Sequence, residues 1–181
     1  MEVTVPSLAL ALLCLLRAGA EVPVQPGFDA EKFAGTWHVA AAVSNCSVFL
    51  KMKDAMKSSI ITISFTPEGD LAMKVVWPML DKCQTFEQLF QRSEPAGHYT
   101  AAQDKRDLRV RETDYGHYAI VHELHQSGRE PSAALQLLTR EQDASPQLLQ
   151  KFKELIPTVR GLTEDMLAVL PKSDQCTKAI S

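Results

Sequence analysis

Residues 28–41 read FDAEKFAGTWHVAA, a stretch in which a predicted helical turn gives way to an apolar strand. Gly35 and Trp37 stand at the junction, two positions apart. Glycine lets the chain turn tightly out of a helical turn, so a strand is predicted over residues 35–43. The pattern Gly-x-Trp is short, and its meaning therefore depends on the rest of the chain.

The N-terminus carries the features of a secretory signal peptide. Residues 8–16 form an apolar run, and Ala18-Gly19-Ala20 is a small-x-small cleavage signal. The run is far shorter than the roughly 20 residues that span a bilayer. We therefore predict a signal peptide at residues 1–20 and a secreted, extracellular protein with no membrane span.

Length and charge limit the domain count and the partners. Removing 20 of the 181 residues leaves 161, a length that suits one domain with its own core. The chain has no internal repeat, low-complexity tract or flexible linker, so a single domain is predicted over residues 21–181. The formal net charge is -3, and the absence of a basic stripe or tail argues against a nucleic-acid partner.

Three cysteines, Cys46, Cys83 and Cys176, remain after the signal peptide. An odd number in an oxidising compartment leaves one thiol free, capped or paired between chains, and three intramolecular pairings are open. A bridge from Cys83 to Cys176 would hold the C-terminal tail, which has few other apolar anchors. The segment Asn45-Cys46-Ser47 is a sequon, which predicts N-glycosylation at Asn45.

Most of the remaining chain has the composition of short strands separated by turn residues. The period-two pattern is clearest where Ile61, Ile63 and Phe65 share one face. Pro78 is predicted to end the third strand, because proline cannot donate to a ladder. Such a series predicts an antiparallel sandwich or barrel. The predicted strands cover residues 35–43, 58–65, 71–77, 83–92, 98–101, 106–113, 118–124 and 133–140.

One amphipathic helix is predicted after the last strand. Ser145 is an N-cap, Pro146 occupies the first helical position and Pro157 stops the helix. We expect its apolar stripe to pack against the outside of the sheet. A second, shorter helical signal covers residues 163–166. The stripe consists of Leu148, Leu149, Phe152, Leu155 and Ile156.

The order of these features resembles the lipocalin family over essentially the whole mature chain. The motif residues are Gly35-Thr36-Trp37, Thr113-Asp114-Tyr115 and Arg140, followed by the helix. Four segments are most similar to a secreted subgroup that includes prostaglandin-D synthase, avian extracellular fatty acid-binding protein and the lipocalin fifteen type. These segments are GFDAEKFAGTW (27–37), SNCSVFLKMKDAM (44–56), ETDY (112–115) and TEDMLAVLPKSDQC (163–176).

The resemblance implies an all-β fold, an eight-stranded antiparallel up-and-down β-barrel with one C-terminal α-helix packed on its outside. In that family the tryptophan, here Trp37, plugs the closed end, and the arginine, here Arg140, covers its indole in a cation-π contact. The family's bridge from the fourth strand to the tail implies a disulfide between Cys83 and Cys176. Cys46 is then the spare thiol of an expected monomer, and it offers a route to a disulfide-linked dimer.

An eight-stranded barrel is wide enough to hold one small ligand. The inward faces suit a fatty acid, a lysolipid, a retinoid or a similar molecule, so the resemblance favours a lipid carrier over a barrel filled by its own side chains. The sequence names neither the ligand nor a cell-surface receptor. The predicted cavity lining is Trp37, Val39, Ala41, Ser59, Ile61, Ile63, Phe65, Leu71, Met73, Val75, Trp77, Phe86, Gln88, Phe90, Leu108 and Val110.

The isomerase activity of prostaglandin-D synthase depends on an inward cysteine thiolate on the second strand, and thiolates are competent nucleophiles. The matching position here is Ser59. The hydroxyls that assist that cysteine correspond here to Val39, Ile61 and Val75. We therefore predict no enzymatic activity, no catalytic residue and no cofactor.

Three histidines, His117, His122 and His125, raise the question of a metal site. His122 points to the opposite strand face from the other two, so three ligands cannot converge, and we predict surface histidines and no metal.

Lys105, Arg106, Arg109 and Arg111 cluster around the sixth strand. Arg109 and Arg111 share the face opposite Leu108 and Val110, which predicts that these two charges face solvent. In the other register they would enter the cavity and favour an anionic ligand or a catecholate siderophore, as a defence lipocalin binds. Lipid capture at the rim by Lys51, Lys53 or Lys57 stays open.

Overall fold

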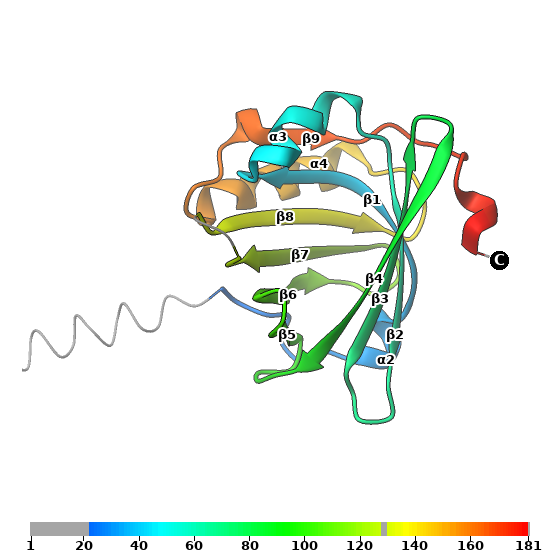
Figure 1. Cartoon of the computed structure of the whole chain (residues 1–181). Helices are drawn as coiled ribbons and strands as arrows, with labels where there is room; N and C mark the ends of the chain where they lie inside the picture. Colours follow the sequence, from blue (N-terminus) through cyan, green and yellow to red (C-terminus); the bar gives the residue numbers. More distant parts are fainter. Residues whose placement is uncertain (1–21, 128–129, 181) are drawn as a thin grey trace, which may run out of the picture.

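The computed structural model describes residues 22–127 and 130–180 and shows a β-barrel with short helices at its edges (Figure 1). The predicted signal peptide lies outside the described residues. The strands are β1 Gly35–Ser44, β2 Ile60–Phe65, β3 Leu71–Met79, β4 Lys82–Arg92, β5 His98–Ala101, β6 Arg106–Thr113, β7 Tyr118–His125, β8 Ser132–Thr139 and β9 Leu167–Val169. The helices are α2 Ala30–Phe33, α3 Ser47–Met52 and α4 Pro146–Leu155, with 3-10 turns η1 Lys53–Ala55, η2 Ile156–Thr158, η3 Glu164–Met166 and η4 Thr177–Ile180.

Strand pairing closes the barrel. Each strand from β2 to β7 pairs with the next one along the chain, and β1 pairs with both β8 and β2. The β1–β2 register places Gly35 opposite Ile63 and Trp37 opposite Ile61. All of these pairings are antiparallel, which confirms the predicted eight-stranded barrel. The short β9 was not predicted, and it extends the sheet along the part of β1 that β2 does not reach.

The prediction that Pro78 ends the third strand is wrong, because β3 continues through Pro78 to Met79. Pro78 lies opposite Cys83 of β4, while the pairing of β3 with β2 stops at Val76. On its other side Pro78 is therefore at a free edge, where proline, which has no backbone N–H, is tolerated.

Two apolar cores share the barrel wall. One fills the closed end of the barrel around Trp37 and Phe33. The other lies between the outer face of β1, β7 and β8 and the helix α4, whose Phe152 is completely buried. The predicted N-cap is present, because Ser145 Oγ accepts a hydrogen bond from the Leu148 N–H at 3.1 Å. Figure 1 shows α4 lying behind the wall that β1 and β8 form. The predicted helix on the outside of the barrel is thus confirmed.

Candidate ligand-binding site

The closed end of the barrel is built around Trp37. Its indole Nε1–H donates to the Phe33 carbonyl at 2.9 Å, and the guanidinium carbon of Arg140 lies 3.7 Å from the centre of the indole ring. Arg140 also donates to the carbonyls of Thr36 and Ala34 at 3.0 Å and to those of Lys32 and Tyr115 at 2.9 Å. The cation therefore ties the helical turn α2 to the start of β1 and to the β6–β7 turn.

The Thr113-Asp114-Tyr115 motif shapes the β6–β7 turn at the same end. The Thr113 hydroxyl donates to the Tyr118 carbonyl at 2.7 Å, and Asp114 Oδ1 accepts from the N–H groups of His117 and Tyr118. Burial raises the pKa of Asp114, but hydrogen bonds from those N–H groups and from the His117 side chain outweigh it and lower the pKa below its usual value. Tyr115 accepts a hydrogen bond from the Asp29 N–H, so the turn also holds α2.

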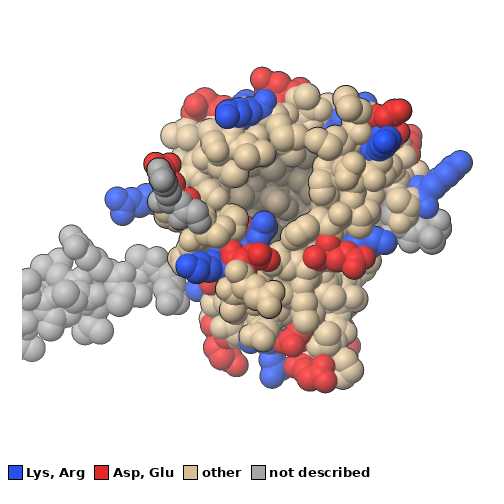
Figure 2. All heavy atoms as spheres, in the orientation of Figure 1, with Lys and Arg blue, Asp and Glu red and all other residues tan. Residues whose placement is uncertain are grey.

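Above this closed end the barrel encloses a cavity of about 400 Å³. Figure 2 shows its opening as a hollow ringed mainly by uncharged side chains, with positive and negative side chains together along the lower edge. The volume is within the range of small-molecule sites in proteins. The predicted residues that line it in the structure are Val39, Ser59, Ile61, Ile63, Leu71, Met73, Val75, Trp77, Phe86, Gln88, Phe90 and Leu108.

Three other predicted lining residues lie outside the cavity wall. Trp37, Phe65 and Val110 belong to the packed core of the barrel interior, where Phe65 lies against Tyr99 with ring centres 5.9 Å apart. Side chains thus fill part of the barrel, as expected for a barrel filled by its own core, and the remainder is the cavity.

The fourth exception, Ala41, lies on the outer face of the barrel against the core beneath α4. The pairing of β1 with β8 shifts register between Val39 and Ala41, which marks a β-bulge. An extra residue in one strand reverses the faces of the residues beyond it. Ala42 and Ser44 consequently line the cavity in place of Ala41.

The cavity also has walls from elements whose inward faces the sequence does not predict. Strands β7 and β8 contribute Val121, Gln136 and Leu138, and α3 contributes Phe49. Cys46, the free thiol at the N-cap of α3, belongs to the same lining. The remaining residues of these walls are Phe33, Met56, Arg106, Glu123, His125, Ser132, Ala133, Ala134 and Leu170.

The structure separates the histidines as expected, but His122 is not a surface residue, and that part of the prediction is wrong. His122 is 4% exposed, and it lies on the outer face of β7 because its neighbours Val121 and Glu123 line the cavity. Burial first, and then the charge of Arg111, lower its pKa to about 4. Among residues 22–127 and 130–180, no group of three or more His, Cys, Asp or Glu side chains could hold a metal ion.

Arg109 and Arg111 point away from the cavity, as the alternation along the sixth strand predicts. Arg109 donates to Asp107 and to the Val22 carbonyl, and Arg111 donates to Thr158 at 3.0 Å. Only Arg106 of this cluster lines the cavity.

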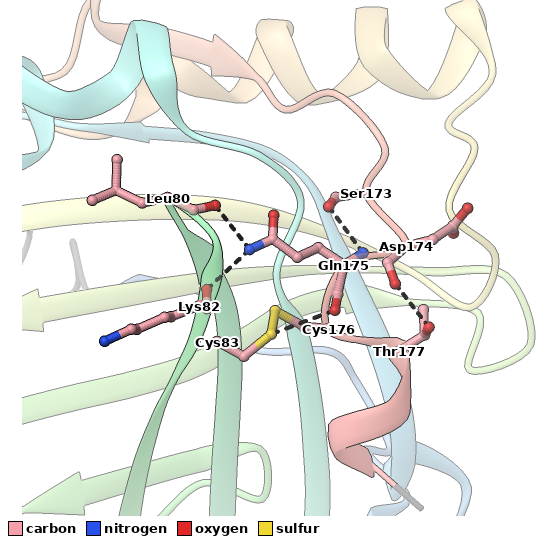
Figure 3. Close-up of a disulfide and its surroundings, with 8 residues drawn as sticks. All are labelled: Leu80, Lys82, Cys83, Ser173, Asp174, Gln175, Cys176 and Thr177. Atoms are coloured by element: carbon pink, nitrogen blue, oxygen red, sulfur yellow. Dashed lines mark hydrogen bonds between the residues drawn. A yellow bond between two sulfur atoms is a disulfide. The ribbon is translucent and has the colours of Figure 1, made fainter.

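The disulfide joins Cys83 and Cys176, the pairing that the family resemblance implied (Figure 3). The Gln175 side chain donates to the carbonyls of Leu80 and Lys82 beside it. The C-terminal tail is therefore fixed to the β3–β4 hairpin by a covalent bond and by hydrogen bonds.

Comparison with known families agrees with this architecture. Residues 34–174 match the model of the lipocalin and cytosolic fatty-acid binding protein family. The chain belongs to the lipocalin family. Within the described parts of this lipocalin, no helix has the length and apolar character needed to cross a membrane.

Several lipocalins are similar over most of their length. Lipocalin-15 of Homo sapiens is 38% identical across 92% of this chain and 91% of its own. Extracellular fatty acid-binding protein of Coturnix japonica is 34% identical across 94% of both chains. Prostaglandin-H2 D-isomerase of Sus scrofa is 30% identical across 92% of this chain and 90% of its own. A solved structure of the siderocalin Ex-FABP, described as having dual ligand specificities, gives a TM-score of 0.72 at 29% identity, covering 78% of this chain and 95% of its own.

Proposed function

We propose that this lipocalin is a secreted carrier that binds a small hydrophobic molecule, such as a fatty acid, lysolipid or retinoid, inside its barrel. The observation that carries the proposal is the open cavity of about 400 Å³ above a closed, packed end. Met73, Val75 and Trp77 line it and are only partly buried, so a bound apolar molecule would remove them from water. Burying ten methylenes is worth roughly 8 kcal/mol before association costs, which is compatible with micromolar affinity.

Isomerase activity is the alternative that the similarity to prostaglandin-H2 D-isomerase raises. Ser59 lines the cavity where that family's catalytic cysteine is expected, and a serine hydroxyl needs an adjacent base to become a nucleophile. No base is hydrogen-bonded to the Ser59 hydroxyl among the described residues. Cys46 provides a thiol at the mouth, but at the start of α3 and not on β2. These features favour a binding protein over an enzyme.

Secretion is part of the proposal and is supported by two observations. Disulfides persist mainly in oxidising compartments, and Cys83 and Cys176 form one. A relative carries the name extracellular fatty acid-binding protein. We propose further that the chain is monomeric, with its signal peptide at residues 1–20, a single domain at 21–181, and Asn45 as a glycosylation acceptor.

Native mass spectrometry of the secreted protein tests the carrier function, followed by denaturing extraction and identification of any small molecule. The variant Ala134→Phe adds a ring to a partly buried position in the cavity wall and should abolish binding. Ala72→Phe is the matched control, because Ala72 of β3 is partly buried and outside the cavity lining. An empty wild-type protein that also fails to bind fatty acids, lysolipids and retinoids would refute the carrier function.

A further inference from the structure

The cavity has two chemically different walls. The side formed by β2, β3 and β4 is apolar except for Gln88 of β4, with Ile61, Met73, Val75 and Phe90 in the lining. Polar side chains gather on the facing strands β6, β7 and β8 (Arg106, Glu123, His125, Ser132 and Gln136). Cross-strand pairing places Arg106 opposite His125 and His125 opposite Ser132, so these three form one row. An apolar wall facing a polar row suits a ligand with an apolar tail and a polar head group.

The fixed charges in the cavity cancel. Among the described residues that line it, only Arg106 and Glu123 are of the Asp, Glu, Lys and Arg types. Arg106 Nη1 donates to Glu123 Oε1 at 2.6 Å, and both side chains are mostly buried. A carboxylate that approached Arg106 would therefore also meet the negative charge of Glu123, and like charges repel strongly where water is scarce. An anionic head group is disfavoured at this row.

Two polar atoms at this site, Arg106 Nε and Gln88 Oε1, are buried without a hydrogen-bond partner among residues 22–127 and 130–180. Gln88 donates to Asp104 at 2.7 Å, and the guanidinium carbon of Arg106 lies 5.6 Å from the ring centre of Phe86. The backbone pairing of β4 with β5 extends only over Gln91 and Arg92 on the β4 side. Beyond the end of that pairing, these side-chain contacts connect β4 to the β5–β6 hairpin. The wall at this point consists of side chains and not of a ladder.

The two unpaired atoms need opposite partners. An N–H such as Arg106 Nε requires an acceptor, and an amide oxygen such as Gln88 Oε1 requires a donor. Both atoms are covered by protein, so rotation of these long side chains, which is fast where packing allows it, is needed to present them to a ligand. A carboxylate only accepts, whereas a hydroxyl or a primary amide both donates and accepts.

We propose that the cavity selects amphiphiles with an uncharged head group that both donates and accepts hydrogen bonds, such as a long-chain alcohol or amide, over anionic lipids. The head group binds beside the Arg106–Glu123 pair and Gln88, and the tail lies against the β2–β4 wall. This inference rests on the proposed carrier function.

The test compares three ligands with a ten-carbon chain, 1-decanol, decyl methyl ether and decanoate, through displacement of the uncharged dye N-phenyl-1-naphthylamine. The ether accepts but cannot donate, and it is more apolar than the alcohol, so a simply apolar cavity binds it at least as tightly as decanol. The proposal expects decanol to bind about tenfold more tightly than the ether, because a site that pairs with a hydroxyl rejects an analogue without the donor. Decanoate should be the weakest ligand of the three.

The variant Glu123→Gln removes one charge and keeps the shape of the side chain, which leaves Arg106 as an unpaired cation. It should improve decanoate binding relative to decanol by about tenfold or more. Glu112→Gln is the matched control, because Glu112 pairs with Lys151 of α4 outside the cavity lining, and it should leave the preference unchanged.

The outcomes separate the two proposals. If the ether binds as tightly as decanol, or if Glu123→Gln folds and does not shift the preference toward decanoate, the head-group inference is overturned while the carrier function stands. If neither the dye nor any of the three ligands binds to the wild-type protein, the carrier function itself fails. The comparison of decanol with the ether needs no variant, so it remains decisive even if Glu123→Gln does not fold.

Discussion

The substitution Arg140→Met should destabilise the barrel by removing the contacts that close its end. It deletes the cation 3.7 Å above Trp37, together with donors to the carbonyls of Thr36, Lys32, Ala34 and Tyr115. A desolvated cation-π contact is worth about 2 kcal/mol. Each hydrogen bond from a charged donor contributes about 1.5 kcal/mol or more, but water can replace most of those at the rim. We therefore expect a loss of about 3 kcal/mol, or roughly 10 °C in Tm for a chain of this size.

Urea unfolding followed by tryptophan fluorescence measures this loss. Arg140→Lys keeps the charge but cannot reach all four carbonyls, and it should lose about 2 kcal/mol, since a point charge does not replace the guanidinium fork. Arg160→Met is the control, because Arg160 is exposed at the surface and should change the stability by less than about 0.5 kcal/mol. If Arg140→Met unfolds within about 1 kcal/mol of the wild type, the guanidinium is not a structural lid.

Two further predictions concern the disulfide and a buried histidine. Replacing both Cys83 and Cys176 with serine opens a loop with a sequence separation of 93, which lowers the free energy of unfolding by up to about 4.7 kcal/mol in the chain-entropy model. Urea unfolding measures this loss. A loss below about 1 kcal/mol would mean that the non-covalent contacts of the tail hold it in place without the disulfide. Burial holds the pKa of His122 near 4, whereas the unfolded chain takes up this proton near pH 6.5, so stability is full above pH 6.5 and is lost as the pH falls toward 4. The loss is at most about 3 kcal/mol, and His122→Gln should flatten the unfolding free energy between pH 6.5 and pH 4.5; an unchanged slope would contradict the assignment.

Much of the barrel could be predicted because its inward faces carry a period-two signal. On β2 and β3, Ile61, Ile63, Met73 and Val75 alternate with Thr62, Ser64 and Lys74, and they line the cavity in the structure. The same signal is ambiguous on β7 and β8, where Ile120 and Leu135 are buried on the outside beneath α4. Both faces of these strands are covered, so apolar character alone does not say which face is inside.

The sequence gives no sign of the bulge in β1. Residues 39–43 are all alanine or valine, and every one of them is buried, so neither face differs from the other in composition. A one-residue change of register in such a segment alters which side chain faces the cavity without altering the pattern. The simple period-two pattern therefore predicts Ala41 in the lining, where Ala42 lies instead.

The net charge of the cavity cannot be predicted from the sequence of one strand. Alternation along β6 places Arg109 and Arg111 outside and, by the same rule, Arg106 inside with Leu108. From this strand alone the cavity would be cationic and suited to an anion. Its neutrality depends on Glu123 of β7, which pairs with Arg106. The strand register places Glu123 opposite Leu108, the next inward-facing residue after Arg106 on β6. Because that register is a tertiary property, the preference for an uncharged head group follows from the pairing of two strands and could not be inferred from either one.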